Sequence, residues 1–541
     1  MKHFIKYIVP SAAVVLSLGL SSCAGDLDVD PIDPNQTTSG EYLADNLLNK
    51  CYANMALAGQ SGPDGDSDVD GIDGGTSGFI RQLFNHNELA SDNFVCSWGD
   101  AGISDFNYIE FNSSNVMSAG LYYRCWTGVK DCNLYLDSYG GADEEKAAEA
   151  RFMRALYYYE LMDNFGNVPF ATTLTESPVR ITRSDLCKWI VSELRSIENK
   201  LSAPTSTPLE GQSGYGRANK YTDQLLLARL YLNSQVYTGT AKNDSALYYA
   251  QQVIKNSPYK LHKTAKSSNW TAYQELFMGD NGQNGASEEC LLALPQDGAT
   301  TASYGTTLFL MASMEQSTVE FQNGFTSNNT TEGWAGNRAR PELVREFFPR
   351  DDAPAEANVR NMYTAAGDDR ALFENLGGKT LENTQIATFT KGYTVAKWSN
   401  WYAGSGEKHN AKFPDTDFFF FRLAEAYLIE AEADARINGG TTTTVGTEAI
   451  NALRSRAHAS TKTTGYDLDY ICNEWNREFY SELLRRQTLV RFNRYGGSSY
   501  NWAWKGGVPD GRGVATTLNL FPIPDQEMNS LGSILIQNPG Y

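Results

Sequence analysis

The sequence predicts a mainly α-helical protein in which paired helices support a loop-rich region. Several segments place apolar side chains at spacings of three and four, as one face of an α-helix requires. Two of these segments are each followed, after a short break, by a second helical segment rich in Ala. Long stretches of Gly, Asn, Ser, Thr and Asp separate the pairs. These observations favour helix pairs stacked as in tetratricopeptide-like repeats.

The clearest helix is predicted over residues 144–165, where one apolar stripe follows the helical period. Its members are Ala148, Phe152, Leu156, Tyr159 and Met162. A stripe of this width predicts a helix with one face in the core.

Two helix pairs follow, predicted at 220–237 with 245–255 and at 421–437 with 448–457. Small residues on these helices allow close approach, as in tetratricopeptide repeats, although generic helical hairpins fit the pattern nearly as well. The helical repeats are expected mainly within 41–260 and 418–496.

Irregular structure is predicted at 58–78, 96–120, 279–340 and 362–417, with the loop-rich region at about 279–417. Loops of this length inside a compact protein usually carry function. Because no Pro- or Ser-rich linker divides the chain, we expect residues 41–541 to form a single unit.

The N-terminus reads as a lipoprotein signal peptide over residues 1–22. Lys2 and Lys6 precede an apolar run at 7–20 that is too short to span a bilayer, and Leu20-Ser-Ser-Cys23 forms a lipoprotein cleavage box. We therefore expect an acylated Cys23, an acidic tether at 23–40 and a lipid-anchored protein at a bacterial envelope. An ordinary secretory signal with a chance cysteine is the alternative.

Composition excludes several classes of function. The net charge of −19 disfavours nucleic acid and anionic lipid headgroups as partners. Without Cys23, seven cysteines remain with no CxxC pair, which excludes a zinc-ribbon site and a dense disulfide framework. Buried free thiols are favoured over one or two disulfides.

Enzyme motifs are absent from the sequence: it has no G-x-S-x-G elbow, P-loop or Rossmann glycine run. A carboxylate pair for glycosidic cleavage is compatible with 64 acidic residues, but no context singles one out. We therefore predict binding and no catalysis.

Two acidic motifs of the sequence are candidate calcium sites. The stretch from Asp66 to Gly71 matches the first half of an EF-hand loop, but position 12 is Ser77 and no helices flank it, so a turn is favoured. Asp415 and Asp417 precede the helix predicted from 421, and helix N-capping explains them without a metal.

Three aromatic residues stand in polar loops: Trp98, Tyr304 and Trp334, each among Gly, Ser, Thr or Asp. A flat apolar ring beside polar groups suits a sugar, whose C–H face stacks on the ring while its hydroxyls bond to neighbours. The alternative is that these rings fold back onto the protein body.

The chain resembles the SusD family along essentially its whole length. The blocks that carry the resemblance are SCAGDLDVDPIDP (22–34), GTSGFIRQLFNHNEL (75–89), RFMRALYYYELMDNFG (151–166), GRANKYTDQLLLARLYLN (216–233), PDTDFFFFRLAEAYL (414–428), TLVRFNRYG (488–496) and NPGY (538–541). It implies a tetratricopeptide-like fold without catalytic activity, needing no cofactor. It further implies an outer-membrane lipoprotein that binds starch or malto-oligosaccharide beside a SusC-like TonB-dependent transporter.

The resemblance also implies roles for individual residues. Trp98, Tyr304 and Trp334 match an aromatic arc that stacks on sugar, while Asp73 and Arg81 match residues that contact sugar hydroxyls. The family pattern has an asparagine where this chain has Ala101, with Asp100 beside it, so the glucan linkage is open. An arc suits a coiled α-1,4-glucan better than a flat β-linked chain.

A structural calcium ion is a further implication of the resemblance, with Asp415, Asp417 and, from the GDNGQNG loop, Asp280 as its ligands. Two alternative functions stay open. One keeps the fold but binds another glycan, or peptide as in RagB-like relatives, and the other is an envelope glycoside hydrolase or lyase.

Overall fold

The computed structural model describes residues 40–314 and 318–541. The predicted signal peptide, Cys23 and the tether up to residue 39 lie outside this part of the chain. The chain divides into two units, residues 1–47 and 48–541. In the described residues, no helix combines the length and the apolar character needed to cross a membrane.

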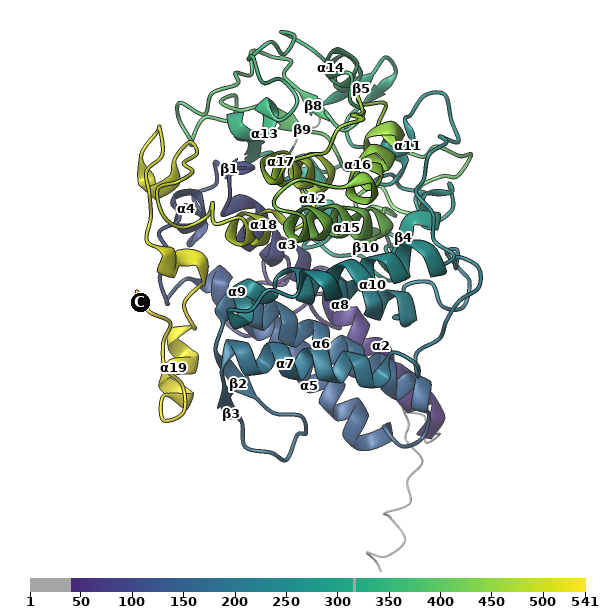
Figure 1. Ribbon diagram of the computed structural model, residues 1–541, viewed down its shortest axis with the longest axis vertical. Helices are drawn as coiled ribbons and strands as arrows, with labels where there is room; N and C mark the ends of the chain where they lie inside the picture. The colour runs from purple at the N-terminus through teal and green to yellow at the C-terminus, as the bar shows by residue number, and fades with distance from the viewer. Residues whose placement is uncertain (1–39, 315–317) are drawn as a thin grey trace, which may run out of the picture. The chain divides into compact units, whose positions relative to one another are not determined.

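Helices dominate residues 40–197, and α5, α6 and α7 lie side by side (Figure 1). The elements are α2 (Gly40–Ala56), α3 (Phe79–Phe84), the π-helix η1 (Asn85–Leu89), β1 (Phe94–Cys96), α4 (Ile103–Tyr108), α5 (Val116–Tyr139), α6 (Glu144–Phe165), β2 (Val168–Phe170), β3 (Val179–Ile181) and α7 (Arg183–Ile197). Helix α6 begins where Asp143 caps two backbone N–H groups and ends before Gly166, at φ 74°. The helix predicted at 144–165 is therefore confirmed.

The two predicted helix pairs pack into one layer, because α10 contacts both α8 and α15 (Figure 1). This layer contains α8 (Lys220–Leu232), α9 (Ser234–Thr238), α10 (Asn243–Asn256), α15 (Leu423–Ile437), α16 (Thr444–Arg456), α17 (Leu468–Phe479) and α18 (Arg485–Arg491). The single helix predicted at 220–237 breaks at Asn233, whose backbone leaves the helical region. The mainly α-helical, tetratricopeptide-like fold is confirmed.

The stretches predicted as irregular contain more structure than expected. They include α4 and the start of α5, and also η2 (Ala286–Glu289), β4 (Cys290–Leu294), α12 (Thr307–Ala312), β5 (Glu320–Gln322), β6 (Phe325–Thr326), β7 (Asn337–Ala339), α13 (Pro341–Arg345), α14 (Val359–Ala366), β8 (Phe373–Glu374) and β9 (Thr394–Val395). The short helix α11 (Ala272–Glu275) lies just before the loop-rich region. These elements are short, and β4 and β7 form only by pairing with the distant strands β10 and β1, so local periodicity does not reveal them.

A second correction concerns the start of α15, which was predicted at residue 421. Phe418–Arg422 instead forms β10, which pairs antiparallel with β4. Asp415 and Asp417 consequently lead into a strand and cap no helix. Four consecutive phenylalanines favour a buried strand, because aromatic side chains pack well on a pleated surface.

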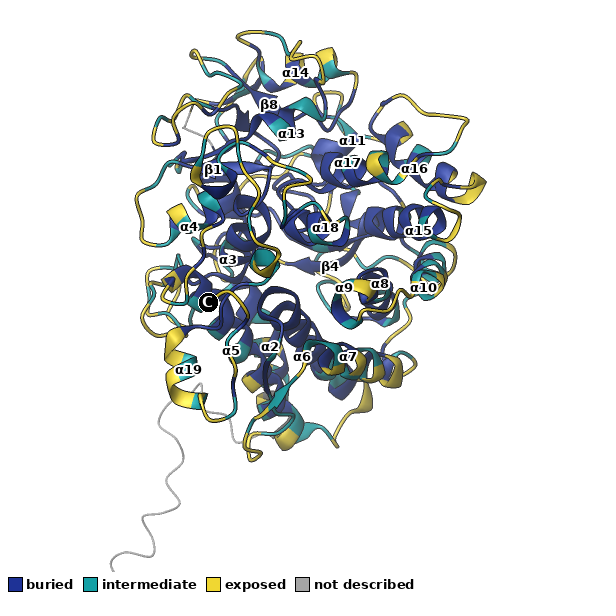
Figure 2. Cartoon of the chain, turned by 60° about the vertical axis from the view of Figure 1, so that its left-hand side comes forward, coloured by how far each residue is buried: buried dark blue, intermediate teal, exposed yellow. Residues whose placement is uncertain are grey.

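The buried core extends through α6, α15 and α17, and Figure 2 shows α15 and α17 largely buried while α19 (Asp525–Leu531) is exposed. The chain ends beyond the short helices η3 (Lys505–Gly507) and η4 (Thr516–Asn519). All seven cysteines of the described residues are free and buried, as favoured from their spacing.

Candidate functional site

Strand pairing brings two of the predicted aromatic residues together although they lie far apart in sequence. Strands β1 and β7 pair antiparallel, with Cys96 opposite Asn337. Trp98 follows the end of β1, and Trp334 precedes the start of β7. Because antiparallel strands place the residues after one strand beside those before the other, the two tryptophan loops are neighbours.

Trp98 packs against Gly336, the residue just before β7. Gly336 has φ +121°, and a Cβ atom there would overlap the indole ring of Trp98. The Ser97 N–H donates to Gly336 O at 2.9 Å and ties the two loops together. Glycine is thus required here for its backbone conformation and for the space that Trp98 fills.

A cavity of about 440 Å³ collects four of the six predicted residues. Its lining consists of Pro63, Asp64, Gly65, Asp73, Gly74, Gly75, Arg81, Tyr304 and Trp334. The first turn of α3 and the loop before α12 meet here, since the Arg81 N–H donates to Gly305 O at 3.0 Å. The cavity falls within the usual size range of small-molecule sites, about 300–1,000 Å³.

Tyr304 and Trp334 form one wall of this cavity. Their ring centroids lie 6.3 Å apart, with an angle of 38° between the ring planes. Both are half-buried and pack on one hydrophobic cluster, formed by Ala302, Leu308, Ala312 and Phe413. Packing on the core therefore fixes the tilt between two partly open rings.

Arg81 lines the cavity and also contacts Trp98. Its guanidinium carbon lies 5.7 Å from the centroid of Trp98 and 5.2 Å from that of Phe309. The Arg81 Nε atom is buried and has no hydrogen-bond partner within the described residues. Since an unpaired buried donor is costly, this N–H is a candidate contact for a ligand that enters the cavity.

The charges beside Arg81 come from Asp73 and Asp100. Burial lowers the pKa of Arg81, and these two carboxylates oppose that shift. Burial alone would raise the pKa of Asp73, but hydrogen bonds from Thr76 and the charge of Arg81 outweigh it and lower the pKa. Asp73 is therefore held as a carboxylate, suited to accept hydrogen bonds from hydroxyls. Asp100 is exposed and outside the cavity lining.

Three polar residues at this site were missed from the sequence: Asp64, Glu332 and Lys412. The Tyr304 hydroxyl donates to Asp64 Oδ1 at 2.9 Å and accepts from Lys412 Nζ. The Trp334 Nε1–H donates to Glu332 Oε2 at 2.6 Å. The ring edges are thus hydrogen-bonded, and the residues that hold them carried no sequence signal beyond a place in a polar loop.

The predicted calcium ligands lie in one acidic region. Asp280 accepts from Gly404 N at 2.7 Å, Asp415 accepts from His409 N at 3.0 Å, and Asp417 accepts from Gln296 N at 2.7 Å. Burial, together with the charges of Glu210 and Asp415, raises the pKa of Asp417 to about 8. No three His, Cys, Asp or Glu side chains in the described residues converge closely enough to hold a metal.

The carboxylate and tyrosine oxygens of this region fit a hard cation chemically. Tyr402 and Tyr215 donate to Asp415 and Asp417. Calcium would therefore require these carboxylates to exchange their present hydrogen bonds for metal contacts.

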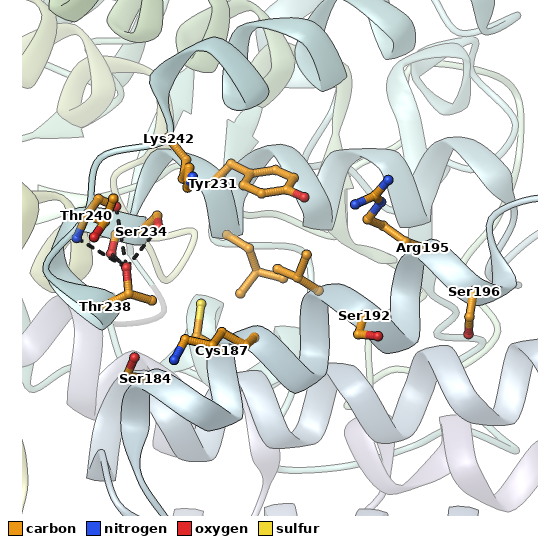
Figure 3. A pocket seen from close by; sticks show the side chains of 13 residues that line it. Ser184, Cys187, Ser192, Arg195, Ser196, Tyr231, Ser234, Thr238, Thr240 and Lys242 are labelled. Carbon is orange, nitrogen blue, oxygen red and sulfur yellow. Dashed lines mark hydrogen bonds between the residues drawn. The ribbon is translucent and has the colours of Figure 1, made fainter.

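A larger cavity, of about 820 Å³, lies among α7, α8, α9 and the loop that leads into α10 (Figure 3). Its basic side chains are Lys188 and Arg195 from α7 and Lys242 from the residue just before α10. None of the six predicted binding residues lines it, and Tyr231 is its single aromatic ring among the described residues. It lacks the paired aromatic wall of the smaller cavity.

Comparison with known proteins places these features in a family. The model of the SusD family matches residues 228–541. The starch-binding protein SusD of Bacteroides thetaiotaomicron is 36% identical over an aligned length of 575 residues, covering 99% of this chain and 99% of that protein.

Two solved structures share the fold. Surface glycan-binding protein A from Bacteroides fluxus superposes with a TM-score of 0.66 at 18% identity, covering 93% of this chain and 100% of that one. Surface glycan-binding protein A from Bacteroides thetaiotaomicron, in complex with laminarihexaose, gives a TM-score of 0.63 at 16% identity, covering 92% and 99%.

Proposed function

The chain belongs to the SusD family, and from this membership we propose that it binds glycan without catalysis at a bacterial cell surface. Its ligand is starch or a malto-oligosaccharide, which it passes to a SusC-like TonB-dependent transporter. The 36% identical relative is named a starch-binding protein, and that name supports the choice of substrate.

The observation that carries this proposal is the tilted pair of Tyr304 and Trp334. Their 38° inclination suits a glucan whose successive rings turn, because each aromatic face meets a differently oriented sugar. Trp98 extends the aromatic surface past Arg81, and the Arg81 Nε and the Asp73 carboxylate supply a donor and an acceptor for sugar hydroxyls.

The absence of catalysis is proposed from membership of the SusD family. Hydrolysis of a glycosidic bond by two carboxylates needs one of them protonated and the other ionised. Release of reducing ends from starch is the direct test, and we expect none.

Attachment to the outer membrane is proposed from the sequence. Cleavage before Cys23 and attachment of a diacylglyceryl group to its thiol would anchor the protein, since several acyl chains bind a membrane stably. Mass spectrometry of the mature N-terminus and a Cys23→Ser variant test this anchor. Co-purification with the transporter tests the partnership.

We further propose that the protein binds a structural calcium ion. Asp415 and Asp417 with Asp280 would hold it through carboxylate oxygens. The raised pKa of Asp417, caused by burial and by the charges of Glu210 and Asp415, supports a cation there because it would neutralise this repulsion.

A second candidate ligand is a laminarin-type β-1,3-glucan. It is favoured by the structural relative solved in complex with laminarihexaose. Ring tilt does not separate the two ligands, because β-1,3-glucans also coil. The tilt between the two aromatic rings disfavours flat β-1,4-glucans, because a flat chain can stack on only one of the two rings.

Calorimetric titration with maltoheptaose, laminarihexaose and cellohexaose tests the proposal. We expect binding of maltoheptaose, weakened about thirty-fold by Trp334→Ala, because a buried aromatic contact at the centre of an interface contributes about 2 kcal/mol or more. Tyr248→Ala, at an exposed tyrosine on α10, is the matched control. Binding of laminarihexaose alone selects the second candidate, and binding indifferent to Trp334 rejects the proposed site.

A further inference from the structure

A second, smaller cavity is built almost entirely of side-chain amides. It measures about 300 Å³ and is lined by Asn269, Gln322, Asn323, Phe325, Asn358, Arg360 and Asn361. Five of these seven side chains carry an amide, and one carries an aromatic ring. None of the residues predicted to bind sugar belongs to it.

The β5–β6 hairpin forms one side of this cavity. Gln322 pairs with Phe325 across the turn Asn323-Gly324, where Gly324 has φ +86°. The turn places the Gln322 amide and the Phe325 ring next to each other on adjacent strands. The hairpin leads directly into the loop that carries Trp334.

Phe325 is held as a fixed, half-buried ring. The ring of Trp270 lies 4.9 Å from it at 72°, and the ring of Trp401 lies 5.0 Å from it at 79°. Trp270 is itself buried. Edge-on packing by two tryptophans leaves Phe325 an ordered apolar surface at the cavity.

The polar lining divides into a structural group and a free group. Gln322 Nε2 donates to Asn269 O at 2.6 Å, Arg360 Nη1 donates to Gln322 Oε1 at 2.7 Å, and Asn358 Nδ2 donates to Glu320 Oε1 at 2.9 Å. These contacts join α14 to the hairpin and shape the cavity.

The free group consists of Asn269, Asn323 and Asn361. Their side-chain amides are exposed and make no hydrogen bond to other described residues. Each amide offers donors and an acceptor, the combination that matches a sugar hydroxyl. Because these amides exchange hydrogen bonds to water for hydrogen bonds to a ligand, each contact adds only about 0.5–1.5 kcal/mol, and several must act together.

The charge of the lining limits the class of ligand. Arg360 is its one charged residue among those described, and it is engaged with Gln322. An anionic ligand would want several free cations and a cationic ligand would want carboxylates. A neutral polyhydroxyl ligand matches amides around one aromatic ring. The volume lies at the lower end of small-molecule sites, about 300 Å³, which suits one or two sugar rings.

We propose that this cavity is a second carbohydrate subsite, which takes a neutral hexose unit at the end or branch of a glycan. The inference extends the proposed glycan-binding function but uses different residues. Because each site alone binds weakly, two sites on one polymer would raise retention through avidity.

The test removes the aromatic arc and asks whether sugar binding persists. Saturation-transfer NMR is recorded with maltotriose and laminaritriose on Trp98→Ala/Trp334→Ala protein. We expect transfer to at least one trisaccharide, lost when Asn269→Ala/Asn361→Ala is added. Asn529→Ala, at an exposed asparagine of α19, is the matched control and should leave the transfer intact.

Two outcomes overturn the inference: no transfer in the arc-deficient protein, or transfer that Asn269→Ala/Asn361→Ala leaves unchanged. If the double tryptophan variant does not fold, Tyr304→Ala provides the arc-deficient background. Maltoheptaose titration of the unaltered protein reports on the arc separately. A failed titration with persistent, Asn361-dependent transfer would reject the proposed arc and keep the second subsite.

Discussion

The ring planes of Tyr304 and Trp334 are inclined by 38°, with their centroids 6.3 Å apart. A flat ligand can stack on only one of two such faces at a time, whereas a coiled one can stack on both. The shared cluster beneath them, which includes Phe413, holds this angle before any ligand arrives. Preorganisation of this kind saves the entropy of ordering side chains on binding.

The hydroxyl of Tyr304 provides a first prediction. It donates to Asp64 and accepts from Lys412. Tyr304→Phe therefore keeps the ring but removes both of these hydrogen bonds. Affinity for maltoheptaose should fall two- to ten-fold, because ordering one freed side chain costs about 0.5–1.5 kcal/mol. Calorimetry measures the change. Tyr248→Phe, at an exposed tyrosine on α10, serves as the control. Unchanged affinity in Tyr304→Phe would mean that these bonds do not orient the ring.

Gly336 provides a second prediction, because a methyl group there would strike Trp98. Gly336→Ala should displace Trp98, weaken glucan binding at least ten-fold and destabilise the protein by about 1–3 kcal/mol through strain at φ +121°. Titration and thermal unfolding measure the two effects.

The matched control is Gly367→Ala, at φ +62° with open space around the glycine. It introduces backbone strain far from Trp98 in sequence and should lower stability while leaving affinity unchanged. Equal affinities in the two variants would contradict the positioning role assigned to Gly336.

How far the sequence alone predicts this protein depends on the range of the interactions involved. Helix α6 could be predicted to the residue, because its stripe, its Asp143 cap and its terminal Gly166 are all local signals. Strand β10 could not, since Phe418–Arg422 becomes a strand only by pairing with β4, more than a hundred residues earlier.

The candidate site also contains residues with local sequence signals and residues without them. Trp98, Tyr304 and Trp334 stand out because rings in polar loops are unusual locally. Lys412 and Asp64 can be recognised as site residues only in the folded protein, where both contact the Tyr304 hydroxyl. No spacing rule links residues so far apart in the chain.

Calcium removal provides a third prediction. Adding calcium to chelator-treated protein should raise the melting temperature, because a ligand that binds only the folded state stabilises it by about 2.7 kcal/mol at a hundred-fold excess over Kd. Asp415→Asn/Asp417→Asn should abolish the shift, and Asp510→Asn, at an exposed aspartate, should not. A melting temperature indifferent to calcium would contradict the proposed ion.

A buried ion network in the core underlies the last prediction. Glu478, on α17, is fully buried and accepts from Arg370 Nη1 at 3.2 Å, from Arg422 Nη1 at 3.1 Å and from Arg456. Burial alone would raise its pKa, but the charges of Arg456, Arg422 and Arg370 outweigh burial and lower the pKa to about 2. The network joins α17 to β10, to α16 and to the segment before β8.

Glu478→Gln should destabilise the protein by about 3–5 kcal/mol, because it leaves buried guanidinium groups without their counter-charge. The pH dependence has a defined sign. A carboxylate whose pKa falls from 4.5 to about 2 on folding stabilises the fold fully above pH 4.5, and this contribution is lost as pH falls towards 2. The midpoint of urea unfolding should therefore fall more steeply below pH 4.5 in the unaltered protein than in Glu478→Gln. Glu448→Gln, at an exposed glutamate on α16, should follow the unaltered protein, and parallel curves for all three would show that Glu478 is not the group that titrates.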